Sequence, residues 1–144
     1  MKFSYKIEVP DVEERRRNCI KLLEKNPEKI PIIFEKDPKS NIEPFPKTRY
    51  LVNKEMTVNH FQLLLRNKLK LDESQAFFLL VDGKICIMGE KTLNEIYIKY
   101  KDKKDGFLYL MYSTDHVQTS RINTVLLTAV PDIHPVESKE VPSE

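Results

Sequence analysis

The segment FLYLMY, residues 107–112, is apolar at all six positions. A strand with one solvent-facing side alternates apolar and polar residues, whereas a strand in the middle of a covered sheet is apolar throughout. We therefore predict a central strand at residues 107–112. The rest of the chain must then supply the strands that lie beside it.

Three earlier segments are candidates for those strands. Residues 29–35, KIPIIFE, are a short β-branched run that predicts another central strand, and Pro31 is tolerable there only where its missing N–H faces no partner. Residues 48–52 predict a strand whose side chains alternate between two faces. Residues 76–88 hold two apolar runs around an Asp-Gly pair, the strongest hairpin signal in the chain.

Helices separate these strands. Residues 11–26, 57–69 and 92–100 each combine an apolar stripe with an Asp or Thr that can cap the helix N-terminus. In the first of them, Glu14 follows Asp11 at the spacing of a capping box. The preceding segment FSYKIEV fits either a short helical turn or an extended arm, and periodicity does not decide between them.

The order of elements is helix, strand, strand, helix, strand, strand, helix, strand. When the first two strands form a hairpin and the last strand lies beside the first, the result is an α+β, ubiquitin-like β-grasp fold. We expect a four- to five-stranded mixed sheet with extra N-terminal helices at residues 1–27. The domain is predicted to span residues 1–117. Residues 118–144 contain no Phe, Tyr or Trp and are predicted to be a disordered extension.

Composition excludes several classes of protein. The 144 residues suit one domain, and the formal net charge is +2. The last fourteen residues carry four acids and one lysine, a net charge of −3, so residues 1–130 carry a net charge of about +5. That surplus permits binding to acidic peptides or anionic headgroups but is too small to indicate nucleic acid. The longest apolar run near the C-terminus, VLLTAV, is too short to span a bilayer, so membrane association is expected to be peripheral or covalent.

We also predict that the chain is not an enzyme and uses no cofactor or metal. The histidines, His60, His116 and His134, are scattered, and no Cys/His spacing resembles a zinc site. Cys19 and Cys86 are expected to be reduced, ordinary residues of a cytosolic protein without a signal peptide. Three glycines cannot form a phosphate-binding loop.

The basic run RRR at residues 15–17 has two interpretations. The favoured one is a solvated helix face on which Glu13 pairs with Arg17. The other is a functional basic patch.

Several motifs together resemble the GABARAP-type autophagy modifiers. They are MKFSYK, PEKIPIIFEK, KTRYLV, MTVNHFQLLLRNKL and FLYLMYS, in this order, and the resemblance covers about residues 1–117. It implies a ubiquitin-like fold with two N-terminal helices. It also implies a cytoplasmic adaptor of autophagy or vesicle traffic, found on autophagosomes or other vesicle membranes.

The resemblance further implies a binding site for peptides of the form aromatic-x-x-aliphatic, usually flanked by acids. Such a peptide adds as a strand to the open edge of the sheet at residues 48–52 and places its two anchors in two pockets. The first pocket is expected to comprise Leu22, Lys29, Pro31, Arg49, Leu51 and Phe107. The second is expected to comprise Tyr50, Val52, Met56, Phe61, Leu64 and Leu65. Lys47 and Arg49, with Lys29 nearby, would meet the acids of the peptide.

The residues alone allow a different interpretation, in which these aliphatic side chains are all core and the basic residues protect the edge against aggregation. The chain also departs from the family pattern at Thr48, at Asn53 and in the tight DGK turn. These departures affect the expected peptide preference and not the fold.

The C-terminal segment is the larger departure. Family members join a glycine shortly after the YS motif to phosphatidylethanolamine, but no glycine follows Gly106 here. Ordinary lipidation is therefore not expected for this chain as written. Three explanations stay open: a non-conjugated paralogue, an altered C-terminus, and a membrane role without the lipid. Conjugation after unusual processing, with autophagy conjugation enzymes as partners, and binding of the basic helices to tubulin are the alternative functions.

Overall fold

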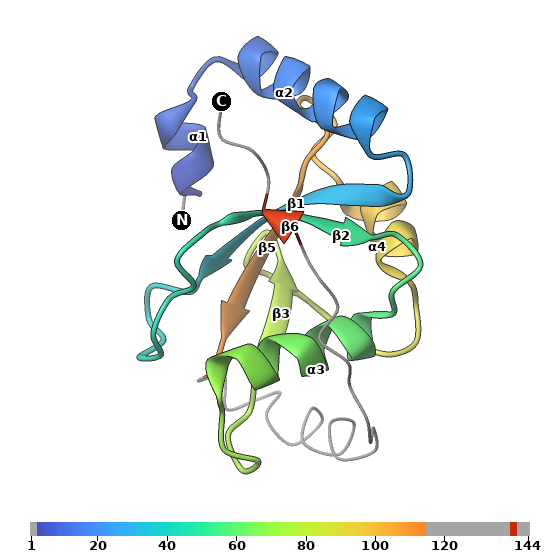
Figure 1. The fold of residues 1–144 in the computed structure, drawn as a ribbon. Coiled ribbons are helices and arrows are strands. Elements are labelled where there is room, and N and C mark those ends of the chain that lie inside the picture. Colours follow the sequence, from blue (N-terminus) through green and yellow to red (C-terminus); the bar gives the residue numbers. More distant parts are fainter. Residues whose placement is uncertain (1–2, 115–138, 141–144) are drawn as a thin grey trace.

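The computed structural model describes residues 3–114 and 139–140, which form one mixed sheet with helices on both faces (Figure 1). The strands are ordered β4-β3-β5-β1-β2-β6. The elements are α1 (Ser4–Glu8), α2 (Val12–Lys25), β1 (Lys29–Lys36), β2 (Arg49–Asn53), α3 (Val58–Leu69), β3 (Phe78–Val81), β4 (Ile85–Ile87), α4 (Leu93–Tyr100), β5 (Leu108–Ser113) and β6 (Lys139–Glu140). The first five strands and the helices form the predicted β-grasp arrangement.

The apolar strand β5 lies in the interior of the sheet, as predicted. It pairs in parallel with β1, from Ile32 opposite Leu108 to Lys36 opposite Tyr112, and antiparallel with β3 on its other side. All six of its residues are buried. The long run of apolar residues therefore exists because this strand has neighbours on both edges and helices over both faces.

Pro31 lies in β1 where its missing N–H faces no strand partner among the described residues, as predicted. It lies opposite Leu51 in the antiparallel pairing with β2, whereas the pairing with β5 begins one residue later, at Ile32. The ring therefore precedes the β1–β5 register, and its missing N–H interrupts none of the pairs in that register.

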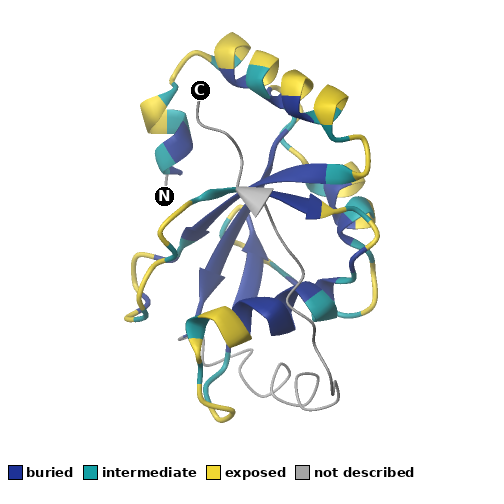
Figure 2. Cartoon of the chain, in the orientation of Figure 1, coloured by how far each residue is buried: buried dark blue, intermediate teal, exposed yellow. Residues whose placement is uncertain are grey.

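The two faces of the sheet hold separate cores. On one face, α3 and α4 cover a cluster that includes Ile32, Phe34 and Leu110. On the other, α1 and α2 cover a cluster that includes Tyr5, Cys19 and Phe107. Figure 1 shows α2 and α3 on opposite sides of the sheet, and Figure 2 shows that each turns its buried side toward it.

Helix starts follow the predicted caps. The side chain of Asp11 accepts a hydrogen bond from the backbone N–H of Glu13. Thr57 and Thr92 accept from the N–H groups three residues later, at 3.1 Å in each case. These caps satisfy N–H groups that have no partner within the helix, which is why the helices begin where they do.

The segment that periodicity left undecided forms the short helix α1. Its first residue, Ser4, donates its backbone N–H and its hydroxyl to the Glu35 carboxylate on β1. Lys6 forms an ion pair of 2.9 Å with Asp102, and the Tyr5 side chain is buried. The helix is too short to be stable alone, so these contacts with the domain hold it.

The predicted Asp-Gly hairpin joins β3 to β4. Val81 lies opposite Ile85, and both Asp82 and Gly83 have positive φ, at 54° and 73°. Glycine adopts this backbone without strain and Asp tolerates it better than most residues, so the local sequence determines the turn.

The sixth strand, β6, was not predicted. It pairs antiparallel with β2, with Tyr50 opposite Glu140 and Leu51 opposite Lys139. The prediction of an unoccupied edge at residues 48–52 is therefore wrong at Tyr50 and Leu51. The physical reason is that an edge strand offers backbone groups to any extended segment within reach.

The predicted domain boundary at residue 117 lies outside the described residues. The predicted disorder of residues 118–144 also falls outside them, apart from β6. Within residues 3–114 and 139–140, none of the helices is long and apolar enough to cross a membrane.

Candidate functional site

The strand β2 presents one set of side chains to each core. Arg49 and Leu51 lie on the face covered by α1 and α2, while Tyr50 and Val52 lie on the face covered by α3. The alternation follows from the two-residue repeat of a strand and agrees with the prediction for these four positions. The strand begins at Arg49, so Lys47 and Thr48 precede it.

The apolar residues predicted for the first pocket come together under α2. Leu22, Leu51 and Phe107 belong to one cluster and are at most 7% exposed. Pro31 is also buried and lies opposite Leu51. Tyr5 packs edge-on against Phe107, with 5.2 Å between ring centroids. These four predicted residues are therefore close-packed core residues beneath α2.

Arg49 lies beside the same cluster, next to Tyr5. Its side chain is half-buried, and its guanidinium carbon lies 5.3 Å from the centroid of the Tyr5 ring. This cation–π contact keeps the charge beside β2 and close to α1. Lys47, just before the strand, accepts a hydrogen bond from the Tyr50 hydroxyl at its backbone carbonyl, at 3.0 Å.

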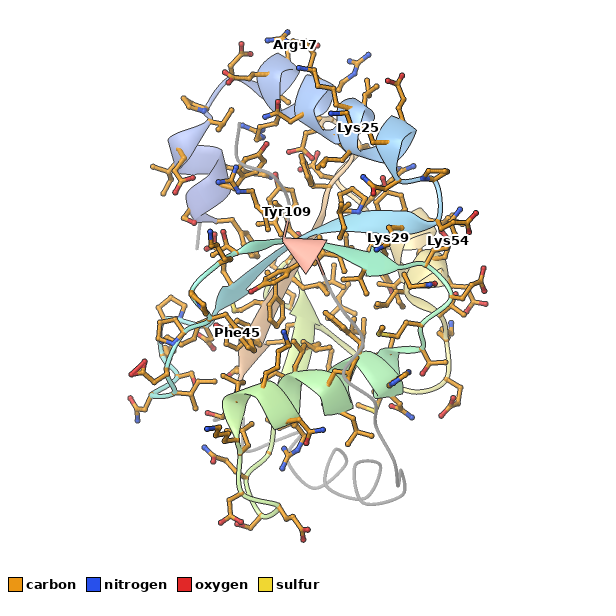
Figure 3. All side chains as sticks on the ribbon, in the orientation of Figure 1. Arg17, Lys25, Lys29, Phe45, Lys54 and Tyr109 are labelled. Atoms are coloured by element: carbon orange, nitrogen blue, oxygen red, sulfur yellow. The ribbon has the colours of Figure 1, made fainter. Side chains whose placement is uncertain are left out.

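Lys29 does not lie near Arg49, contrary to prediction. In the β1–β2 pairing Lys29 is opposite Asn53, whereas Arg49 is opposite Ile33. Four residues of strand separate the two cations, roughly 13 Å. Figure 3 labels Lys29 together with Lys54 at that end of the sheet. The prediction did not take the hairpin register into account. That register places Lys29 beside the last residue of β2, whereas Arg49 is the first.

The residues predicted for the second pocket meet on the opposite face. Tyr50 packs against the cluster from the edge, with 6.3 Å between its ring centroid and that of Phe34. The residue as a whole is half-buried, and its hydroxyl donates to the Lys47 carbonyl. The other five residues all lie in the same core cluster and are at most 8% exposed: Val52, Met56, Phe61, Leu64 and Leu65.

Sequence reasoning missed the residues that hold α1 and α2 onto the sheet. Arg15, predicted to be part of a solvated face, is buried and bonds to the buried carboxylate of Asp105. The predicted Glu13–Arg17 pair is not the one observed, since Glu13 lies 3.7 Å from Arg16. An apolar alternation in KFSYK, with Phe3 and Tyr5 both buried, was the available signal that this segment packs against the domain.

The outer side of α2 carries charges of both signs. Arg16, Arg17, Lys21 and Lys25 are exposed, and so are Glu13, Glu14 and Glu24. Figure 3 labels Arg17 on the side of α2 away from the sheet. This arrangement is typical of a solvated helix face, which fits the favoured interpretation of the basic run except at Arg15.

A shallow pocket of about 200 Å³ lies at the opposite border of the sheet, between β4 and α4. It is lined by Ile85, Met88, Lys99 and Tyr100 among others. None of the predicted site residues contributes to it. The candidate site therefore rests on β2 and the two clusters beneath it, and not on this pocket.

Comparisons with known proteins identify the family of the chain. A family model described as "Autophagy protein Atg8 ubiquitin like" matches residues 14–119. Autophagy-related protein 8e of Arabidopsis thaliana is 37% identical over 106 residues, which are 74% of this chain and 85% of the relative. Microtubule-associated protein 1 light chain 3 gamma of Homo sapiens is 38% identical over 91 residues, 62% of this chain and 61% of the relative.

The crystal structure of Trypanosoma brucei ATG8 matches with a TM-score of 0.65 and 34% sequence identity, over 72% of this chain and 87% of that one. The likeness confirms the predicted fold with its N-terminal helices. Proteins of this family are non-enzymatic ubiquitin-like modifiers. This agrees with the prediction from the sequence that the chain is not an enzyme. The chain belongs to the Atg8 family of ubiquitin-like autophagy proteins.

Proposed function

We propose that this protein is an adaptor that binds short peptides of the form acidic-aromatic-x-x-aliphatic by adding them as a strand to β2. The observation that supports this most directly is the pairing of β6 with Tyr50 and Leu51. An extended segment on this border supports the proposal that β2 can accept another strand. Main-chain hydrogen bonds would supply generic affinity, and side-chain anchors would supply selectivity.

The two clusters beneath β2 support the two-anchor form of the motif. One anchor enters the first pocket, at Leu22, Pro31, Leu51 and Phe107. The other enters the second pocket, at Tyr50, Val52, Met56, Phe61, Leu64 and Leu65. Because these side chains are already close-packed, each anchor must displace them, and that cost limits affinity. We therefore expect dissociation constants in the micromolar range, about −8 kcal/mol at 1 μM.

The acids that flank the motif would lie beside Lys47 and Arg49. Both cations lie at the start of β2: Arg49 is its first residue, and Lys47 precedes it by two residues. Lys29 lies at the other end of the strand and would meet acids only at the other end of the guest. These contacts are partly exposed, so they should contribute modestly and weaken with salt.

A titration of labelled peptide against the full chain tests the proposal. Leu51→Ala and Tyr50→Ala should weaken binding, each by about tenfold, because each removes apolar contact from one pocket. Ile85→Ala is the matched control, since Ile85 is an exposed aliphatic residue on β4, at the other border of the sheet. Circular dichroism establishes that each variant is folded. Unchanged affinity for both β2 variants would show that the pocket assignment is wrong.

The expected setting is that of an autophagy protein: cytoplasm, autophagosomes and other vesicle membranes, with motif-bearing receptors and adaptors as partners. Within the family we assign the chain to the GABARAP type, on the motifs KFSYK, RYLV and FLYLMYS. Peptide arrays that contain ligands selective for each subgroup would test that assignment, and preference for ligands of another subgroup would overturn it.

Conjugation to lipid is the alternative state of the same protein, with autophagy conjugation enzymes as partners. Residues 107–144 contain no glycine, so conjugation would require a different terminal residue or an altered C-terminus. The intact mass of protein recovered from membranes distinguishes the two states. An unmodified mass excludes the conjugate, and an added lipid mass establishes it.

Binding to tubulin is a second candidate, favoured by the exposed arginines of α2. One relative bears the name of a microtubule-associated protein. The acids on the same helix face argue against a strong electrostatic contact. Co-sedimentation with microtubules at low and raised salt decides: binding that disappears with salt supports this candidate, and absence of binding at low salt rejects it.

A further inference from the structure

We propose that the strand β6, Lys139–Glu140, is an internal competitor, which occupies the peptide-binding border of β2 until a guest displaces it. This inference rests on the proposed function, because it concerns the same border. It assigns a regulatory role to a C-terminal strand that the family fold of five strands does not need. In Figure 1 the strand β6 lies beside β2, at the end of the sheet order.

The contact falls at the centre of the proposed site. β6 pairs with Tyr50 and Leu51, and these two residues belong to the second and first pockets respectively. Each backbone N–H and C=O on the outer border of a strand can serve one neighbouring strand at a time. A guest peptide that pairs with the middle of β2 must therefore remove β6.

The charge of the C-terminal segment matches that of the expected guest. Residues 131–144 contain four acids and one lysine, while Lys47 and Arg49 stand at the start of β2. The segment is thus of the same electrostatic class as an acid-flanked peptide. Both should be attracted to β2 and should compete for it.

The segment differs from a guest in its anchors. The chain contains no Phe, Tyr or Trp after Tyr112, so β6 has no aromatic side chain to place in a pocket. Its pairing with β2 extends over only two residues. β6 therefore gains mainly the free energy of main-chain hydrogen bonds with β2. A guest with two side-chain anchors should bind more tightly and displace it.

Attachment to the same chain compensates for this weakness. Twenty-four residues separate Thr114 from Lys139. Pairing within one chain is an intramolecular event, for which effective concentrations reach about the millimolar range. If the border is free in about 10–30% of molecules, the apparent dissociation constant of a guest rises by about three- to tenfold.

The test compares two double variants of the full chain. Lys139→Pro with Glu140→Pro removes both backbone N–H groups of β6 and disfavours the strand. Lys139→Ala with Glu140→Ala removes the same side chains but retains the backbone, so it is the matched control. Each chain is titrated with a fluorescent Asp-Asp-Trp-Ala-Ala-Leu peptide. We expect the proline variant to bind about three- to tenfold more tightly than the wild type, and the alanine variant to bind within about twofold of the wild type.

The outcomes separate the two proposals. Equal affinity of the wild type and the proline variant overturns the internal competitor but leaves peptide binding in place. Absence of binding by every chain overturns the proposed function and the competitor with it. Tighter binding by the proline and alanine variants alike overturns the backbone mechanism, because it assigns the effect to the side chains.

Hydrogen exchange of the free protein provides a readout that needs no guest. We expect amide exchange in residues 49–53 to accelerate in the proline variant and to stay at the wild-type rate in the alanine variant. Unchanged exchange in the proline variant would mean that β6 does not protect β2, and the competitor would be rejected. An affinity difference that disappears on dilution of the protein would place the strand in a second copy and overturn the internal arrangement.

Discussion

The Nε atom of Arg15 on α2 lies 2.8 Å from Oδ2 of Asp105, and the Asp105 side chain is fully buried. The same carboxylate accepts hydrogen bonds from the Tyr109 hydroxyl and from the backbone N–H of Phe107. The pKa of the Tyr109 hydroxyl is raised by burial and by this carboxylate. The pair therefore ties the N-terminal helices to β5 and to the turn before it.

Replacement of Arg15 by methionine should lower the free energy of unfolding by about 3 kcal/mol. The variant keeps most of the packing volume but leaves the Asp105 carboxylate buried without its cation. Arg16→Met is the matched control, because Arg16 is exposed and only 3.7 Å from Glu13, and it should change stability by less than about 1 kcal/mol. Urea denaturation measures both. Equal effects would mean that the buried pair has no special role.

Gly106→Ala should destabilise the protein more than Gly89→Ala. A Cβ atom at Gly106 would lie 2.8 Å from Sγ of Cys19, whereas one at Gly89 would meet no atom within 4 Å. Both glycines have positive φ, at 88° and 100°, so both variants incur backbone strain of about 1 kcal/mol or more. The clash at Gly106 adds about 1–3 kcal/mol.

A double-mutant cycle isolates that clash. In a Cys19→Ala background the sulfur is absent, and the remaining Cβ of Cys19 is at an ordinary contact distance of 3.6 Å. Gly106→Ala should then cost about 1 kcal/mol less than in the wild type. Identical costs in the two backgrounds would place the strain in the backbone alone.

Cys19 should resist alkylation in the folded protein. Burial raises the pKa of its thiol to about 11, and the side chain is 1% exposed. At pH 8 only about 0.1% of such a thiol is thiolate, which is the reactive form. Iodoacetamide at pH 8 should modify the half-buried Cys86 first, and Cys19 only in denaturant. Mass spectrometry of digested protein assigns the sites, and equal rates for both cysteines would contradict the prediction.

The contact between α1 and the domain should weaken in acid. Burial alone would raise the pKa of Asp102. The hydrogen bonds from Lys6 and from the N–H groups of Lys104 and Asp105 have a larger, opposite effect, so the pKa of Asp102 lies below the ordinary 3.8. A carboxyl with a lowered folded-state pKa stabilises the fold above its unfolded pKa. It loses that contribution as pH falls through the folded-state value.

The test for this acid dependence is Lys6→Met, which should lower stability by up to about 1 kcal/mol at pH 7, because the ion pair is partly exposed. The difference from the wild type should shrink toward pH 2. Lys103→Met, at an exposed lysine in the same turn, is the control and should show no such dependence. A difference that is constant from pH 7 to pH 2 would contradict the assignment to Asp102.

Local signals in the sequence predicted most of the fold. The caps at Asp11, Thr57 and Thr92 and the turn at Asp82 each depend on residues close in sequence, and all are observed. The uninterrupted apolar run of β5 also predicted its central place, since only a strand covered on both faces tolerates such a run.

Features that depend on distant residues were the ones missed. Arg15 looks like part of a charged helix face until Asp105, ninety residues later, is placed beside it. The separation of Lys29 from Arg49 follows from the register of a hairpin and not from composition. The strand β6 has two residues, too few for any periodic pattern, and its pairing depends on what border is within reach.

The place of β5 between β1 and β3 also governs the order in which the molecule can assemble during synthesis. Until residues 108–113 leave the ribosome, the β1–β2 and β3–β4 hairpins have no strand to join them. Each nascent hairpin then exposes a bare apolar border that invites aggregation. A chain that ends before this segment would therefore keep two hairpins that no strand joins into one sheet, and it would be a substrate for chaperones or proteases.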